Sequence, residues 1–123
     1  MAEVNSYRDL HVWQKSMTLV TDIYRLSASF PKEKKFGLTN QIRRSAVSVP
    51  SNIAEGYGRN STSDYIRFLQ IASGSLYELQ TQLQIAENLE FVRHQQTQTA
   101  NALATECEKM LSSLITKLKS KLK

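Results

Sequence analysis

The fold is decided by the stretch QIRRSAVSVPSNIAEGYGR, residues 41–59, because it carries two different stripes in one helical register. The apolar stripe places four side chains on one helix face: Ile42, Ala46, Val49 and Ile53. This face predicts a helix that packs on a core. The polar stripe follows the same steps on another face, and we take it as a candidate subunit interface: Gln41, Ser45, Ser48, Asn52 and Glu55.

The short polar side chains of this stripe are unusual, because a surface helix normally carries long charged residues opposite its core. They predict that a second helix or another subunit lies close by. The alternative is an ordinary solvated face, since exposed polar residues are common.

Pro50 interrupts the same helix without ending it. A proline inside a helix removes one backbone hydrogen bond and clashes with the preceding turn, which costs about 3 kcal/mol in an exposed helix. The apolar stripe nevertheless keeps its register on both sides of Pro50. We therefore predict one helix over residues 39–57 with a kink at Pro50.

Three further segments have helical periodicity, at about residues 10–30, 62–92 and 97–122. The segment over 62–92 is the most regular, with apolar residues at the alternating spacings of left-handed bundle packing: Tyr65, Leu69, Ala72, Leu76, Leu79, Leu83 and Ala86. Short connections predict antiparallel neighbours. The predicted fold class is all-α, with a single antiparallel four-helix bundle that forms one domain over residues 1–123.

Length and composition agree with this fold and indicate where in the cell the protein is expected. A chain of 123 residues, of which 41% are hydrophobic, is long enough for one core. No apolar run approaches the roughly 20 residues of a membrane span, and no secretory signal is recognised. The lone cysteine, Cys107, excludes an internal disulfide. We expect a cytoplasmic protein that does not attach to membranes.

Positive charge gathers in two places. Residues 1–108 contain eleven Lys and Arg and eleven Asp and Glu, so the five later lysines supply the whole net charge of +5. A second cluster surrounds the start of the helix over 39–57. Repeated basic surfaces bind phosphate backbones, so we predict a nucleic-acid ligand, RNA before DNA. The candidate residues are Lys32, Lys34, Lys35, Arg43, Arg44, Lys117, Lys119 and Lys121.

Both clusters also have a structural explanation, which the sequence leaves open. Cations near a helix C-terminus interact favourably with the helix dipole, and lysine stems cover apolar surface. Arg43 or Arg44 could instead form ion pairs with Glu55, Glu78 or Glu87, because arginine often serves in such pairs.

The chain has too few suitable groups for catalysis or for a metal site. It contains only two histidines, whereas a di-iron bundle needs two Glu-x-x-His pairs and two further glutamates. Cys107 belongs to an apolar stripe, where a cysteine is most often an inert core residue. Gly56 and Gly58 follow a helix and not a strand, so they end that helix and do not bind a dinucleotide. We predict no enzyme activity, no metal and no cofactor.

Several motifs occur together and in order: YRDLHVWQK at 7–15, FP at 30–31, FGLT at 36–39, the stretch 41–59, and FLQIASGSLYEL at 68–79. In this order they resemble the four-helix bundle proteins named after 23S rRNA intervening sequences. The resemblance covers Tyr7 to about Val92. Ser16 and Ser45 stand where relatives are expected to have alanine, and beyond Arg93 the chain matches only in being helical and rich in lysine.

The resemblance implies an all-helical bundle, a homo-oligomer that is a ring-like pentamer in characterised relatives, a proposed nucleic-acid role and no known catalysis. Accessory proteins of diversity-generating retroelements are similar in fold, and a reverse transcriptase and nucleic acid are their expected partners. The alternative function is therefore a protein-interaction scaffold that docks a partner enzyme such as a reverse transcriptase.

Overall fold

Four helices make up most of the computed structural model, which describes residues 3–31 and 37–122. They are α1 (His11–Ser27), α2 (Leu38–Tyr57), α3 (Thr62–Asn88) and α4 (His94–Lys119). Short 3-10 helices precede α1 (η1, Tyr7–Asp9) and follow α4 (η2, Ser120–Leu122). The predicted all-helical bundle is confirmed.

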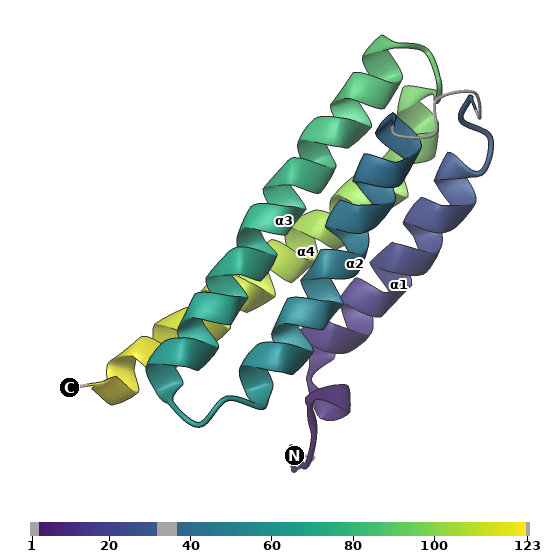
Figure 1. Cartoon of the computed structure of the whole chain (residues 1–123). Coiled ribbons are helices and arrows are strands. Elements are labelled where there is room, and N and C mark those ends of the chain that lie inside the picture. Colours follow the sequence, from purple (N-terminus) through teal and green to yellow (C-terminus); the bar gives the residue numbers. More distant parts are fainter. Residues whose placement is uncertain (1–2, 32–36, 123) are drawn as a thin grey trace.

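The helices run alternately up and down the bundle (Figure 1). The start of α1, the turn between α2 and α3 and the end of α4 lie together, and we term this the lower end. The starts of α2 and α4 lie at the opposite, upper end. Residues that are far apart in the sequence therefore meet at each end of the bundle.

The buried side chains of the four helices form one core. The apolar stripe of α2, which the sequence predicts to face the core, is fully buried, as are the central members of the stripe on α3. α1 and α4 complete the core with Leu19, Ile23, Ala104 and Leu111. The periodicity therefore predicted correctly which faces of α2 and α3 are buried.

Pro50 lies within α2, and the helix continues through it to Tyr57. The prediction of one uninterrupted helical segment on both sides of the proline is confirmed. Pro50 is itself buried. The kink stays a prediction.

The helix boundaries differ most from the predicted ones at the connection between α3 and α4. α3 ends at Asn88 and not at residue 92, because Glu90 has a φ of 62° and turns the chain out of the helix. α4 begins at His94 and not at residue 97, and the backbone N–H of Arg93 donates to Gln96 Oε1 at 2.9 Å. This bond satisfies a backbone donor at the start of the helix. α1 and α4 each end three residues earlier than predicted, at Ser27 and Lys119.

α2 and α3 approach each other closely near the turn that joins them. A Cβ atom on Gly56 would lie 2.7 Å from the Cβ of Phe68, which is too close for two carbon atoms. Glycine at this position therefore allows the two helices to pack. The register of α2 against α3, which forms the site described below, is held from this end.

Candidate nucleic-acid interface

The polar stripe of α2 faces α3 of the same chain. Ser48 Oγ lies 2.8 Å from Ser75 Oγ on α3. Asn52 Nδ2 donates to the backbone oxygen of Ser48 at 2.8 Å and to its hydroxyl at 2.9 Å. Ser45 is also buried. The close neighbour that the short polar side chains predict is therefore α3.

Gln41 and Glu55, at the two ends of the stripe, are its exposed members. Glu55 Oε2 accepts a hydrogen bond from Arg59 Nη2 at 3.1 Å. A subunit contact through the polar stripe stays a prediction. These two side chains are the members most accessible for such a contact.

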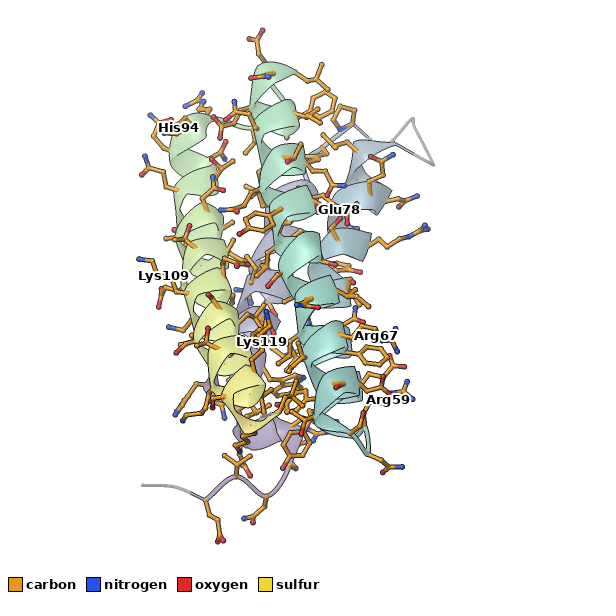
Figure 2. The ribbon with its side chains drawn as sticks, turned by 90° about the vertical axis from the view of Figure 1, so that its left-hand side faces the viewer. Arg59, Arg67, Glu78, His94, Lys109 and Lys119 are labelled. Carbon is orange, nitrogen blue, oxygen red and sulfur yellow. The ribbon has the colours of Figure 1, made fainter. Side chains whose placement is uncertain are left out.

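A groove between α2 and α3 lies above the Ser48–Ser75 contact, and we term it the α2–α3 groove. It encloses about 500 Å³, and its described lining is entirely polar: Gln41, Arg44, Ser45, Ser48, Ser75, Glu78 and Gln82. Figure 2 shows Glu78 on the side of α3 that faces α2. Gln82 Oε1 is buried and has no hydrogen-bond partner among the described residues. The sequence did not predict this groove.

Arg43 has a structural role at the upper end of the bundle. Its Nε donates to Ser27 Oγ at 2.8 Å, and its Nη2 donates to the backbone oxygen of Tyr24 at 3.1 Å. The guanidinium also lies 4.5 Å from the centre of the Tyr24 ring. Arg43 therefore joins α2 to the end of α1, through a hydroxyl and a carbonyl and not through a carboxylate.

Arg44 is exposed at the edge of the α2–α3 groove. No carboxylate in the described part of the chain lies within ion-pair distance of it, although Glu78 lines the same groove. Its guanidinium group is therefore available to an external anion. Of the two neighbouring arginines, Arg44 is the better candidate for binding phosphate.

We term Lys117, Lys119 and Lys121 the C-terminal lysines, and all three are exposed. Lys117 and Lys119 lie in the last turn of α4 and Lys121 lies in η2. The end of α4 is at the lower end of the bundle (Figure 1), where Figure 2 labels Lys119. Within residues 3–31 and 37–122, none of them forms an ion pair or a side-chain hydrogen bond. Three full positive charges are therefore exposed to solvent over the last turn of α4 and η2.

Two arginines that sequence reasoning missed lie at the same lower end (Figure 2). The guanidinium groups of Arg59 and Arg67 lie 4.6 and 5.0 Å from the centre of the Phe68 ring. They also pair with Glu55 and Asp64 at 3.1 and 3.5 Å. Both ion pairs are largely exposed and therefore weak. The predicted antiparallel topology could have identified these arginines, because it brings the α2–α3 turn to the end of the bundle where α4 ends.

The two predicted basic clusters do not meet within one chain. Arg43 and Arg44 lie in the upper half of α2, and the C-terminal lysines lie at the lower end (Figure 1). The remaining predicted residues, Lys32, Lys34 and Lys35, lie outside the described residues.

An apolar cleft on the other side of α2 separates it from α1, and we term it the α1–α2 cleft. It encloses about 350 Å³ and is lined by Tyr7, Trp13, Met17, Val20, Val47, Pro50, Ser51 and Ala54. Met17 and Val47 are 41% and 39% exposed. These two partly exposed apolar side chains, on α1 and α2, line the same cleft.

Cys107 is unsuited to nucleophilic chemistry. It is buried, and this burial raises the pKa of its thiol to about 11, so the thiol stays protonated at neutral pH. Over the described ranges, no group of three His, Cys, Asp or Glu side chains is placed to hold a metal ion. The described helices include none that is long and apolar enough to cross a membrane.

Comparison with known proteins shows one family. The chain matches the family model described as 23S rRNA-intervening sequence protein over residues 8–113. It is also similar to the crystal structure of a protein of unknown function from the S23 ribosomal protein family of Bacteroides thetaiotaomicron VPI-5482. The two share 30% sequence identity with a TM-score of 0.76, over 85% of this chain and 97% of that one. No curated protein matches the chain.

Proposed function

This chain belongs to the 23S rRNA-intervening sequence protein family, and we propose that it is a non-catalytic protein that binds RNA through exposed, unpaired cations. The family resemblance drawn from its motifs is thereby confirmed. The similar crystal structure is of a protein of unknown function, so the proposal rests on the residues of this chain. It requires no cofactor, and the expected location is the cytoplasm.

The observation that carries the proposal is the group of C-terminal lysines. Lysine side chains that are exposed and unpaired neutralise phosphates and release the counterions that surround a nucleic acid. Residues 1–116 contain twelve Lys and Arg and eleven Asp and Glu, a net charge of only +1, so these lysines dominate the long-range field of the chain. The family name refers to 23S rRNA, which favours RNA over DNA as the ligand.

Arg44 supplies a second point of contact with phosphate. Its guanidinium is exposed and has no ion-pair partner among the described residues, and this group can bind two phosphate oxygens at once. Arg43 has a different role in the proposal, because its hydrogen bonds to Ser27 and Tyr24 hold the start of α2 in place. Lys32, Lys34 and Lys35 precede this helix in the sequence and stay predicted contacts.

The proposal includes a homo-oligomer, which repeats these cations around an assembly. We place the subunit contact at the α1–α2 cleft, because Met17 and Val47 are apolar and partly exposed there. The polar stripe of α2 is less suitable, since Ser48 already contacts Ser75 on α3 and Asn52 donates both of its hydrogen bonds to Ser48. The resemblance to characterised relatives implies five subunits.

The proposal is tested by replacing the three C-terminal lysines with glutamine. Lys117→Gln, Lys119→Gln and Lys121→Gln are combined in one variant, and its affinity for a fluorescent single-stranded RNA is measured at low salt. We expect at least about tenfold weaker binding, because three phosphate contacts are removed. Lys109→Gln is the control, since this lysine lies on the same helix farther from its end (Figure 2). Equal affinities of the triple variant and the control would contradict the proposal.

A second candidate function is a scaffold that docks a partner protein, such as a reverse transcriptase. The α1–α2 cleft favours it, because its exposed apolar side chains are suited to a protein surface. The two functions are distinguished by RNA binding. A protein that binds no RNA at low salt but still assembles would support the scaffold.

A further inference from the structure

We propose that the α2–α3 groove binds one ribose–phosphate unit of an RNA strand, with Arg44 on the phosphate and Glu78 on the 2′-hydroxyl. This inference rests on the proposed function, and it names the group by which the protein distinguishes RNA from DNA. It concerns a different part of the molecule from the C-terminal lysines, so the two can be tested separately.

The register of the two helices brings the required side chains together. Ser48 on α2 contacts Ser75 on α3, and the helices are antiparallel (Figure 1). One turn toward the upper end of the bundle, Arg44 is therefore level with Glu78, and all four side chains line the same groove. Arg44 therefore places a positive charge on the α2 side of the groove, and Glu78 places a negative charge on the α3 side.

These two charges have no ion-pair partner within residues 3–31 and 37–122. Arg44 and Glu78 are both exposed, and no ion pair within 4.0 Å joins them or links either to another described residue. A ligand between them can therefore use both. Arginine matches the geometry of a phosphate, whereas a carboxylate only accepts hydrogen bonds and needs a donor on the ligand.

The carboxylate is the informative group, because a negative charge beside a phosphate backbone weakens binding unless it makes a compensating contact. The donor nearest to a phosphate in RNA is the 2′-hydroxyl, which DNA lacks. Acidic side chains hold ribose hydroxyls in the same way in dinucleotide-binding folds. Glu78 therefore favours a ribose over a deoxyribose.

The rest of the groove fits a sugar better than a base. None of its described lining residues is aromatic, so it offers no ring on which a base could stack. Gln82 has an amide oxygen without a hydrogen-bond partner among the described residues, and it lines the same groove as Ser45. A rotation of the Gln82 amide would present this acceptor to a further sugar hydroxyl. The volume of about 500 Å³ is within the usual range for small-molecule sites.

The test compares three probes of one base composition: oligouridine RNA, its 2′-deoxy form and its 2′-O-methyl form. Anisotropy is measured with the full chain and with Glu78→Ala. We expect the wild-type protein to bind the RNA about tenfold tighter than the other two probes. A difference in affinity of this size corresponds to the free energy of one hydrogen bond to a charged group. The Glu78→Ala variant should bind all three probes with about equal affinity.

The control separates a hydrogen bond from simple repulsion. Glu106→Ala removes one negative charge from an exposed ion pair with Lys15 on another face of the bundle, so it should leave the preference for RNA unchanged. If Glu78 only repels nucleic acid, Glu78→Ala will tighten binding of all three probes equally, and the inference is wrong.

A variant of the other wall completes the test. Arg44→Gln should weaken the binding of all three probes, because each of them carries the phosphate. Unchanged binding by Arg44→Gln would also overturn the inference, while the lysine-dependent affinity would leave the proposed function standing. If the wild-type protein binds none of the probes, both the inference and the proposed function are wrong.

Discussion

At the scale of single residues, Arg43 and Arg44 show what a sequence can and cannot predict. The sequence showed both as cations near the start of a helix. Because successive residues of a helix point in different directions, the two side chains have different neighbours. Arg43 points to α1 and binds Ser27 and the Tyr24 carbonyl, whereas Arg44 borders α3. The sequence could not predict these partners, because they depend on how the end of α1 meets the start of α2.

The contacts of Arg43 predict a loss of stability on its removal. Arg43→Ala is expected to lower the free energy of unfolding by about 1–2 kcal/mol, because it removes two hydrogen bonds of a charged group from a partly exposed site. Urea unfolding measures this change. Arg44→Ala is the matched control and should alter stability by less than about 0.5 kcal/mol. Equal losses in the two variants would contradict the structural role of Arg43.

Glu87 predicts a dependence of stability on pH at the upper end of the bundle. Its Oε2 accepts from Thr97 Oγ1 at 2.7 Å, and its Oε1 lies 3.0 Å from His94 Nδ1. The bond from Thr97 and then the one with His94 lower the pKa of Glu87 below its ordinary value of 4.5. A carboxyl with a lowered pKa stabilises the fold above its unfolded-state pKa and loses this effect as the pH falls through the folded-state pKa.

Glu87→Gln is therefore expected to be less stable than the wild-type protein at neutral pH. The difference should shrink as the pH falls through the lowered pKa of Glu87, because the carboxyl group then becomes protonated and its advantage disappears. Urea unfolding of both proteins over a pH series gives the measurement. A difference that stays constant across the series would show that ionisation of Glu87 does not stabilise the fold.

At the scale of helices, the faces of α2 were predictable and the end of α3 was not. The two stripes of α2 follow from side-chain spacing, and the apolar one is fully buried. The turn after α3 contains no glycine or proline, and it depends on Glu90 with a positive φ, which is uncommon outside glycine. The α2–α3 groove was also hidden, because it depends on the register between two helices. The Ser48–Ser75 contact and Gly56 hold this register.

Two glycines give a matched test of this helix packing. Gly56→Ala is expected to destabilise the protein by about 1–3 kcal/mol, because its Cβ would lie 2.7 Å from the Cβ of Phe68 and the helices would have to separate. Gly74→Ala meets nothing within 4 Å and should stabilise α3 by up to about 1 kcal/mol. Thermal or urea unfolding compares the two. A Gly56→Ala protein as stable as wild type would show that close packing at Gly56 is not required.

At the scale of the whole molecule, the topology decides which charges act together. The lysine-rich end of the chain was evident in the sequence. The antiparallel bundle then places Arg59 and Arg67 at the same end and keeps Arg43 and Arg44 at the other (Figure 1). A sequence shows how much charge a segment carries, but only the fold shows which segments share a surface.

The proposed subunit contact makes a prediction about mass in solution. Introducing Met17→Glu and Val47→Glu together should lower the mass measured by light scattering, because charged groups would be buried at the α1–α2 cleft. Leu89→Glu is the control, since Leu89 is 55% exposed and lies outside this cleft. If the double variant keeps the mass of the wild-type protein, the subunit contact lies elsewhere.

The central claim is that unpaired cations bind the phosphate backbone of RNA. The most direct measurement is the affinity of the wild-type protein for single-stranded RNA across a salt series. Each neutralised phosphate contributes a slope of about −0.7 in log affinity against log salt concentration, so the three C-terminal lysines predict a slope of about −2 or steeper. A slope near zero, or no binding at low salt, would contradict the claim.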